Sequence, residues 1–310
     1  MYPYDVNDST TSLEEIYGSR LNQVPCLQSR QSISELSGGL TNINLLIESA
    51  ESKYVARISS NSSSLLSIDR ESEYRNSLLA AEIGIAPQVH CYLAGQGVLV
   101  IGYLGGRTFS AEDVSKNLPG IAKSCRTLHS AKPFVRDFNM FDIQKSYLDI
   151  VQERKFRLPG NYLKYADLVS RMHKAMKVLE EPTVPCNNDL LPGNFIDDGE
   201  KIWIIDYEYS GNNDACFELG NIWAESFLEL GQLEELVDAY YGTHRPEKVA
   251  RAWLQALLGK YGWTLWASIQ SSVSELDFDF WSWGMAKYEL AQSEFTSPYF
   301  TKMLTQVTNK

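Results

Sequence analysis

Three oxygen-bearing side chains follow one another near the middle of the chain. Asp189, Asn194 and Asp206 occur in the order acid, amide, acid within VPCNNDLLPGNFIDDGEKIWIIDYEYSG. Carboxylate and amide oxygens ligate Mg2+ in phosphate-transferring sites, where a further carboxylate orients the attacking hydroxyl. We therefore predict a phosphoryl-transfer site, with Asp189 as the catalytic base and Asn194 and Asp206 as magnesium ligands.

The local sequence indicates how these side chains could meet. The Pro-Gly pair before Asn194 predicts a tight turn that brings Asp189 and Asn194 to one side. Asp206 ends the strand-like run IWIID, and if that strand continues, Glu208 lies on the same face and is a candidate for a second metal contact. Taken singly, Asp, Asn, Pro and Gly are ordinary turn residues, so the prediction depends on their order together.

The two motifs resemble a known family. NNDLLPGN followed by WIIDYEYSGNNDACFELGN is similar to the catalytic and metal loops of choline and ethanolamine kinases, within the aminoglycoside phosphotransferase superfamily. The resemblance extends from LSGGLTNIN and YVARI to WTLWASIQ, about residues 33–283. It implies ATP and Mg2+ as cofactors. Where the superfamily usually has His two residues before the catalytic Asp, this chain has Asn187, at a position that the resemblance implies is a structural support.

A glycine-containing loop and two charged residues are candidates for nucleotide binding. LSGGLTN offers unobstructed backbone amides for phosphates, although a Gly-Gly pair alone is more typical of a plain hairpin turn. By resemblance, Arg57 would face the α- and β-phosphates and pair with Glu73, with Glu71 as the other candidate partner and a solvated surface pair as the alternative. VIGYL could supply an adenine hinge or be a buried edge strand. The predicted ATP contacts are Ser37, Gly38, Gly39, Thr41, Asn42, Arg57, Glu73, Gly102 and Leu104.

Clustered indoles indicate the acceptor. Trp263 and Trp266 are three residues apart and share a helical face, a spacing that is usually typical of core residues. The alternative is an aromatic cage, since a quaternary ammonium cannot donate hydrogen bonds and is bound by ring faces at about 2 kcal/mol each when desolvated. GWTLWASIQ is similar to the choline-binding helix of choline kinases, and the resemblance adds Trp283 and the carboxylate of Glu225 to the predicted acceptor site.

The elements that must position these residues change character along the chain. SLEEIYGSRL predicts one short helix, NINLLIES and SKYVARIS a hairpin, and residues 68–83 a helix that stops at Gly84. VHCYLAG and GVLVIGYL predict two more strands, and beyond Gly105 helical patterns dominate. We predict an α+β protein-kinase-like fold of two lobes: a small, mainly antiparallel sheet over residues 1–101, and a mainly helical lobe over residues 102–310 that holds the catalytic loop, the metal loop and the substrate pocket.

Composition limits the class of partner. Lys and Arg number 28 against 39 for Asp and Glu, so a net charge of −11 repels nucleic acid and anionic lipid and attracts cations. The five cysteines are scattered without CxxC spacing, and His129 is interpreted as a hydrogen-bonded core residue, so no zinc site is predicted. No signal peptide or apolar run of about 18 residues occurs, which favours a cytoplasmic protein without membrane insertion. Oligomeric state stays open.

The predicted function is ATP- and Mg2+-dependent phosphorylation of the choline hydroxyl. Alternatives of the same fold are kinases of ethanolamine, an aminoglycoside or an amino-sugar, although aminoglycosides are expected to meet clustered acids rather than indoles. A non-catalytic, kinase-shaped scaffold is another class, which Asn187 supports and the retained acids oppose. A protein kinase fits less well because HRD, DFG and APE motifs are absent from the sequence.

Overall fold

The computed structural model describes residues 12–36, 39, 41–59 and 63–309. Contacts within the chain group it into two compact units, one within residues 1–60 together with Gln88–Tyr103, the other within residues 61–87 together with Leu104–Lys310. The lobe boundary expected at residue 101 stays a prediction.

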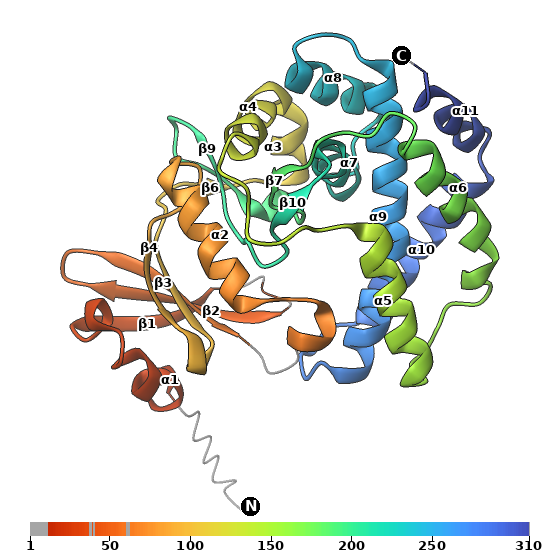
Figure 1. The fold of residues 1–310 in the computed structure, drawn as a ribbon. Helices are drawn as coiled ribbons and strands as arrows, with labels where there is room; N and C mark the ends of the chain where they lie inside the picture. The colour runs from red at the N-terminus through yellow and green to blue at the C-terminus, as the bar shows by residue number, and fades with distance from the viewer. Residues whose placement is uncertain (1–11, 37–38, 40, 60–62, 310) are drawn as a thin grey trace, which may run out of the picture. The chain divides into compact units, whose positions relative to one another are not determined.

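The first unit is built on a five-stranded antiparallel sheet, coloured red to orange in Figure 1. The strands lie in the order β1-β2-β3-β5-β4. They are β1 (Arg30–Leu36), β2 (Asn42–Ser49), β3 (Lys53–Ser59), β4 (Val89–Leu93) and β5 (Val98–Gly102). The predicted hairpin is confirmed as β2–β3, and the two further strands as β4 and β5.

A short helix packs beside this sheet. α1 (Leu13–Leu21) starts at a capping box in which Ser12 and Glu15 bind each other's backbone amides, which satisfies donors that a helix start leaves open. Its Leu21 joins the buried apolar side chains of the strands, including Leu45, Ile47 and Val98. Because β2 alternates inward apolar with less buried residues, one face of the sheet forms this core.

The second unit is mainly helical. After α2 (Arg70–Glu82), its helices are α3 (Ala111–Lys116), α4 (Leu118–His129), α5 (Met140–Glu153), α6 (Ala166–Met176), α7 (Ala215–Glu225), α8 (Leu230–Tyr241), α9 (Pro246–Val273), α10 (Phe280–Thr296) and α11 (Pro298–Gln306). α10 and α11 are separate helices because Ser297 between them is extended and caps α11, whose first residue is Pro298.

The helix expected after the hairpin is α2, and it belongs with the second unit. The Asp69 side chain caps α2 by accepting from the amides of Glu71 and Ser72, and Gly84, at φ 73°, follows the end of the helix as expected. The side-chain nitrogen Nδ2 of Asn76 donates to the backbone carbonyl of Ser210 at 3.2 Å and to the Ser210 hydroxyl at 3.0 Å. α2 is thereby attached to the chain that follows Asp206.

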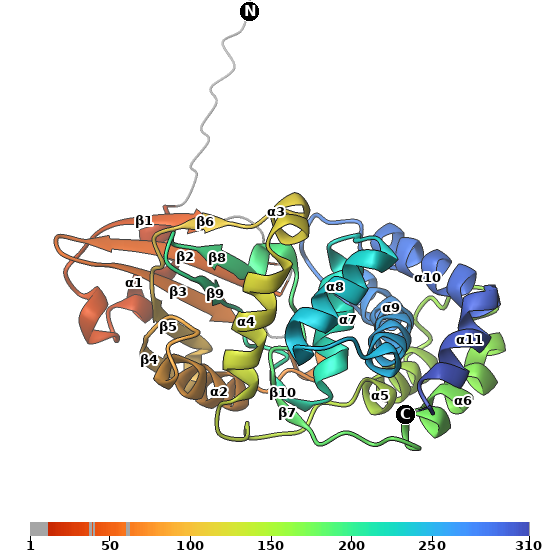
Figure 2. The ribbon, with the colours of Figure 1, turned by 90° about the horizontal axis from the view of Figure 1, so that it is seen from above.

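The longest helix, α9, forms the centre of the second unit. All residues from Lys248 to Gln270 are buried, so this part of the helix is enclosed on every side. It contacts α5, α7 and α10, which surround it in Figures 1 and 2. Across the described ranges, no helix combines the length and the apolar character needed to cross a lipid bilayer.

Short strands carry the polar loops of the second unit. One sheet has the order β6-β8-β9, made of β6 (Arg107–Thr108), β8 (Phe195–Asp197) and β9 (Ile202–Ile204). The other pairs β7 (Val184–Cys186) with β10 (Gly211–Asn213). The predicted catalytic loop lies between β7 and β8, and the predicted metal loop lies between β9 and β10.

Candidate active site

The loop after β7 brings Asp189 and Asn194 together. A short 3-10 turn at Pro192–Asn194 reverses the chain, and the amide Nδ2 of Asn194 donates to the carbonyl of Asp189 at 2.7 Å. This is the arrangement that the Pro-Gly turn predicts. Because Nδ2 of Asn194 donates this hydrogen bond, Oδ1 is the side-chain atom of Asn194 that could bind a cation.

Asn187 connects this loop to the metal loop. Its Nδ2 donates to the carbonyls of Ile205 at 3.1 Å and Asp206 at 2.7 Å, and its Oδ1 accepts from the amide of Asp189 at 3.0 Å. A second link joins the amide of Ile205 to the carbonyl of Asn194 at 3.0 Å. The residue that departs from the superfamily pattern therefore holds both loops in register.

Asp206 lies in a strained conformation beyond β9. Its φ of 64° is in the left-handed region, which L residues other than Asn and Asp rarely adopt and which is common at functional sites. β9 ends at Ile204, so the strand does not continue and strand alternation does not place Glu208. The carboxylate of Glu208 instead accepts from Arg70 at 3.1 Å, and Arg70 also pairs with Glu73 at 2.7 Å.

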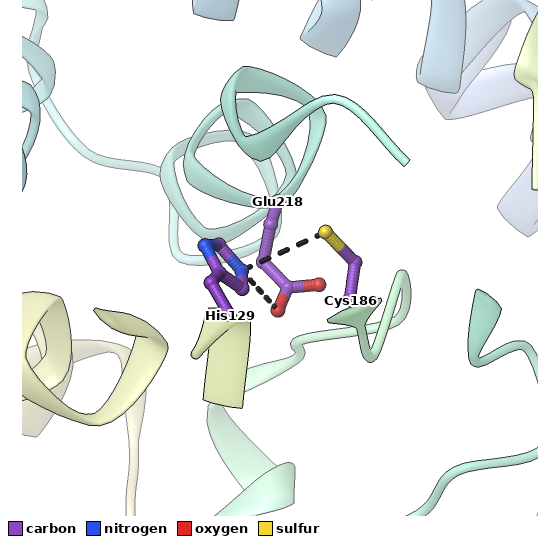
Figure 3. Close-up of side chains that lie close together, drawn as sticks. All are labelled: His129, Cys186 and Glu218. Carbon is purple, nitrogen blue, oxygen red and sulfur yellow. Dashed lines mark hydrogen bonds and ion pairs between the residues drawn. The ribbon is translucent and has the colours of Figure 1, made fainter. Parts of the chain in front are cut away.

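A buried polar cluster lies behind the catalytic loop (Figure 3). Glu218 of α7 accepts from the backbone amides of Asn187 at 3.2 Å and Asn188 at 2.7 Å. The ring nitrogen Nε2 of His129 lies 3.2 Å from the same carboxylate and 3.6 Å from the sulfur of Cys186. Since a carboxylate only accepts, Nε2 carries a hydrogen there.

The cluster confirms the interpretation of His129 as a hydrogen-bonded core residue, since the side chain is buried and contacts Glu218 and the Tyr240 hydroxyl. His129, Cys186 and Glu218 also each offer a ligand atom within 4.8 Å of the others, a proximity that the sequence did not indicate. Burial raises the pKa of the Cys186 thiol well above its usual value. With both oxygens of Glu218 bound by loop amides, we interpret the cluster as a support for the catalytic loop.

Asp189 is half-buried as a residue, and carboxylates surround its side chain. Burial raises its pKa well above the usual value, and repulsion raises it further. The repelling carboxylates, largest effect first, are Asp206, Glu208 and Glu225, while the ammonium of Lys287 acts in the opposite direction. The predicted base, the predicted metal ligands and the predicted acceptor acid therefore share one electrostatic neighbourhood.

Two of the predicted acceptor indoles contact Tyr209, and the third packs on one of them. Trp263 packs edge-on against the Tyr209 ring, with centroids 5.1 Å apart, and Nε1 of Trp266 donates to the Tyr209 hydroxyl at 2.7 Å. Trp266 also lies edge-on to Trp283 at 5.4 Å. Trp263 and Trp266 are only 6% and 5% exposed, whereas Trp283 is partly exposed. The carbonyl of Tyr209 accepts from Nδ2 of Asn188 at 3.0 Å, which ties the indoles to the catalytic loop.

Glu225 and Trp283 share one cation, the ammonium of Lys287. Nζ of Lys287 lies 2.5 Å from the Glu225 carboxylate and 4.3 Å from the centroid of the Trp283 ring. The structure therefore brings together Glu225 and Trp283, as the resemblance implied. It adds Lys287, which sequence reasoning did not identify.

The first unit holds most of the predicted nucleotide residues. Arg57 is in the middle of β3, where it is paired across the sheet with Asn44 and Leu99. Gly39 approaches the carbonyl of Asn42 so closely that a Cβ would clash, so this loop position requires glycine. Nδ2 of Asn42 donates to the Thr41 hydroxyl at 3.0 Å. Ser37 and Gly38 lie outside the described residues.

The predicted hinge and the predicted ion pair stay predictions. Gly102 ends β5, and its backbone amide donates to the carbonyl of Gln88 at 2.8 Å. Leu104 is the first residue of the segment Leu104–Lys310, which belongs to the second unit. Glu73 is buried in α2. The proposed Arg57–Glu73 pair would join residues of different units.

Two residues of this site were not identified from the sequence, for different reasons. Glu218 lies within the metal-loop motif ACFELGN without an assigned role, and its position beneath two loop amides depends on the packing of α7. Lys287 stands four residues after Trp283, so helical spacing alone could have placed its cation beside that ring.

Comparisons with known proteins identify the family of the chain. A sequence profile of the family described as choline/ethanolamine kinase matches residues 33–235, which is 203 of the 310 residues. The chain is 27% identical to rat ethanolamine kinase 2 over 254 residues, covering 72% of this chain and 65% of that relative. The matched part thus spans slightly under two thirds of the relative's length.

Solved structures of similar proteins give the fold. A choline/ethanolamine kinase family protein from Mesorhizobium loti, 26% identical, superposes with a TM-score of 0.83 over 96% of this chain and 99% of that one. A GDP complex of aminoglycoside 2'-phosphotransferase-IIIa shares the fold alone, at 14% identity and a TM-score of 0.67 over 91% of this chain and 99% of that one. The α+β, protein-kinase-like fold predicted from the sequence is confirmed. The chain belongs to the choline/ethanolamine kinase family.

Proposed function

We propose that the chain transfers the γ-phosphate of ATP to the hydroxyl of a small amino alcohol, with choline as the first candidate. The observation that carries this proposal is the crowding of carboxylates around the half-buried Asp189. Such crowding is costly for a protein without a cation, and it suits a site that receives both a divalent metal and a cationic acceptor.

Mg2+ fits the donor set of the two loops. Oδ1 of Asn194 and the carboxylate of Asp206 are hard oxygen donors on loops that hydrogen bonds hold in register. Glu208 would have to share its carboxylate with Arg70 to become a further ligand. When bound, Mg2+ would neutralise charge on the phosphates.

Asp189 would act on the acceptor hydroxyl. An oxygen of its carboxylate would accept the hydroxyl hydrogen, align the alcohol oxygen for attack, and take the proton as the new bond forms. Its raised pKa favours taking up that proton. The links from Asn187 and Glu218 support this role because they hold the backbone around Asp189.

The nucleotide contacts are part of the proposal. Gly39 has no Cβ and lies close to the backbone of Asn42, as a glycine in a phosphate-covering loop can. Arg57 would donate hydrogen bonds from its guanidinium to phosphate oxygens. Relatives of the fold occur as nucleotide complexes, such as the GDP complex of the aminoglycoside enzyme. The remaining proposed ATP contacts are Ser37, Gly38, Thr41, Asn42, Glu73, Gly102 and Leu104.

The nature of the acceptor rests on the indole cluster. Choline is favoured because Trp283, with Trp266 and Trp263 behind it, offers ring faces beside the carboxylate of Glu225. Ethanolamine is the second candidate, because the ammonium that Glu225 binds in this structure, that of Lys287, is a primary one that donates a hydrogen bond. The similarity to rat ethanolamine kinase 2 also supports it.

An acceptor screen tests the proposal directly. Purified protein, ATP and Mg2+ would be incubated with choline, ethanolamine, an aminoglycoside and no acceptor, with ADP release as the readout. Acceptor-dependent release with choline or ethanolamine is expected, and it should disappear when EDTA removes the metal. ADP release that is the same in all four samples would refute the proposal.

A further inference from the structure

Lys287 places a cation of the protein itself in the predicted acceptor site. Its ammonium makes an ion pair of 2.5 Å with Glu225 and lies 4.3 Å from the centroid of the Trp283 ring. Both charged side chains are only 12% exposed, so the pair is largely removed from water. Trp283 and Lys287 are four residues apart on α10, which puts them on one helical face.

This contact has the chemistry of organic ammonium recognition. A carboxylate on one side and an indole face on the other is the combination that binds ammonium groups in proteins. The proposed function places the acceptor's ammonium beside the same Glu225 and Trp283. In this structure the ammonium of Lys287 therefore occupies the position proposed for the ammonium of the acceptor.

Two cations cannot share this position without cost. One carboxylate neutralises one ammonium, and a second ammonium beside Lys287 would meet like-charge repulsion at low solvent exposure. Lys260 is also buried nearby, above the Trp223 ring at 4.8 Å, but it has its own carboxylate partner in Glu294, so Glu225 is the carboxylate left for a second cation. The flexible stem of Lys287 allows its ammonium to leave Glu225, whereas the indole is fixed by packing.

We propose that Lys287 determines acceptor specificity as an internal cation that the acceptor's ammonium must displace from Glu225 and Trp283. This inference rests on the proposed function for the identity of the displacing group. A neutral alcohol of the same shape cannot replace the ion pair and is rejected, while a cationic acceptor regains the carboxylate and ring contacts that Lys287 gives up.

Direct binding of small ammonium probes tests the displacement. Tetramethylammonium and methylammonium would be titrated into the whole chain, with intrinsic tryptophan fluorescence or calorimetry as the readout. Lys287→Met keeps the length of the side chain and removes the charge, so we expect about tenfold tighter binding. Lys287→Arg, which keeps a cation, should not tighten binding, and Lys123→Met on the exposed face of α4 should leave it unchanged.

A double variant tests whether Glu225 is the carboxylate for which Lys287 and the acceptor's ammonium compete. In Lys287→Met combined with Glu225→Gln both charges are gone, so the tighter binding of the single variant should be lost. Unfolding curves of each variant identify any that fail to fold. The inference is overturned if Lys287→Met binds tetramethylammonium no more tightly than the unmodified chain, or if the double variant binds as tightly as Lys287→Met.

Kinetics separate this inference from the proposed function. In Lys287→Met the KM for choline or ethanolamine should fall by a similar factor, with kcat and the KM for ATP little changed, a split that general structural damage would not produce. If the unmodified chain phosphorylates neither acceptor, the proposed function fails. The binding titrations, which use probes without a hydroxyl, still decide the role of Lys287.

Discussion

Asn187 illustrates how one side chain can organise two loops. A primary amide has two donor hydrogens and an acceptor oxygen, and Asn187 uses them on the carbonyls of Ile205 and Asp206 and on the amide of Asp189. A neutral imidazole offers one donor and one acceptor, so a histidine at this position could make fewer of these bonds. The departure from the superfamily pattern is therefore compatible with a well-held loop.

Removing these bonds should affect metal use. In Asn187→Ala the carbonyls of Ile205 and Asp206 lose a buried donor, and we expect a stability loss of about 1–3 kcal/mol. The Mg2+ concentration for half-maximal rate should rise more than the KM for the acceptor, because Asp206 is the proposed ligand. Mg2+ titrations of ADP release measure this, with Asn187→His as a partial replacement. An unchanged Mg2+ dependence would contradict the coupling of the two loops.

The clearest residue prediction concerns the proposed base. Asp189→Asn keeps the shape of the side chain and removes the proton acceptor, so kcat should fall by about 10²–10⁴-fold. ATP binding, measured by calorimetry, should stay within about twofold, since the proposed ATP contacts lie elsewhere. Asp149→Asn, an exposed position on α5, is the matched control. Near-normal turnover in Asp189→Asn would remove the basis of the mechanism.

At the scale of elements, α7 links the catalytic loop to the acceptor cluster. Glu218, near its start, binds the loop amides, and Glu225, at its end, faces Lys287 and Trp283. Seven residues are two helical turns, so both carboxylates project from one side of α7. A rigid α7 therefore fixes the distance between the proposed base and the proposed acceptor acid.

The contact of α7 with α9 depends on one glycine. A Cβ on Gly220 would collide with the carbonyl of Ala252, so Gly220→Ala must push the helices apart and should destabilise the protein by about 1–3 kcal/mol. Gly231→Ala in the exposed start of α8 meets nothing within 4 Å, and should be neutral or stabilising by up to about 1 kcal/mol. Urea unfolding of both variants measures the difference. Equal midpoints would show that the helices are not in close contact.

Elements with strong local patterns were predictable. The alternation in NINLLIES predicted β2, and the helical period with a glycine stop predicted α2. β1 was not predicted because RQSISEL is mostly polar, as an edge strand allows, and β7 and β10 are too short to show a period. The nearness of Asp189 to Asn194 was predictable from a local turn. The contacts of Glu218 with the loop and of Lys287 with Glu225 were not, because they join distant elements.

At the scale of the whole molecule, the two units divide the proposed tasks. The proposed base, metal ligands and acceptor cluster all belong to the second unit, while Gly39, Thr41, Asn42 and Arg57 belong to the first. The acidic excess of the whole chain, a net charge of −11, adds to the local carboxylates of the acceptor site. Long-range attraction of a cationic acceptor is the expected consequence.

Salt should weaken this attraction. Raising ionic strength from about 20 mM to about 500 mM shortens the Debye length from about 20 Å to about 4 Å, so kcat/KM for choline should fall by about three- to tenfold. The neutral isostere 3,3-dimethylbutan-1-ol, which is expected to react slowly because it cannot displace Lys287, has no charge to attract. Its kcat/KM should therefore change little. Measurements at saturating ATP and Mg2+ keep the charge of the nucleotide out of the comparison. If both alcohols respond equally to salt, the acidic field does not guide the acceptor, and the short-range contacts of Glu225 and Trp283 alone must account for its selection.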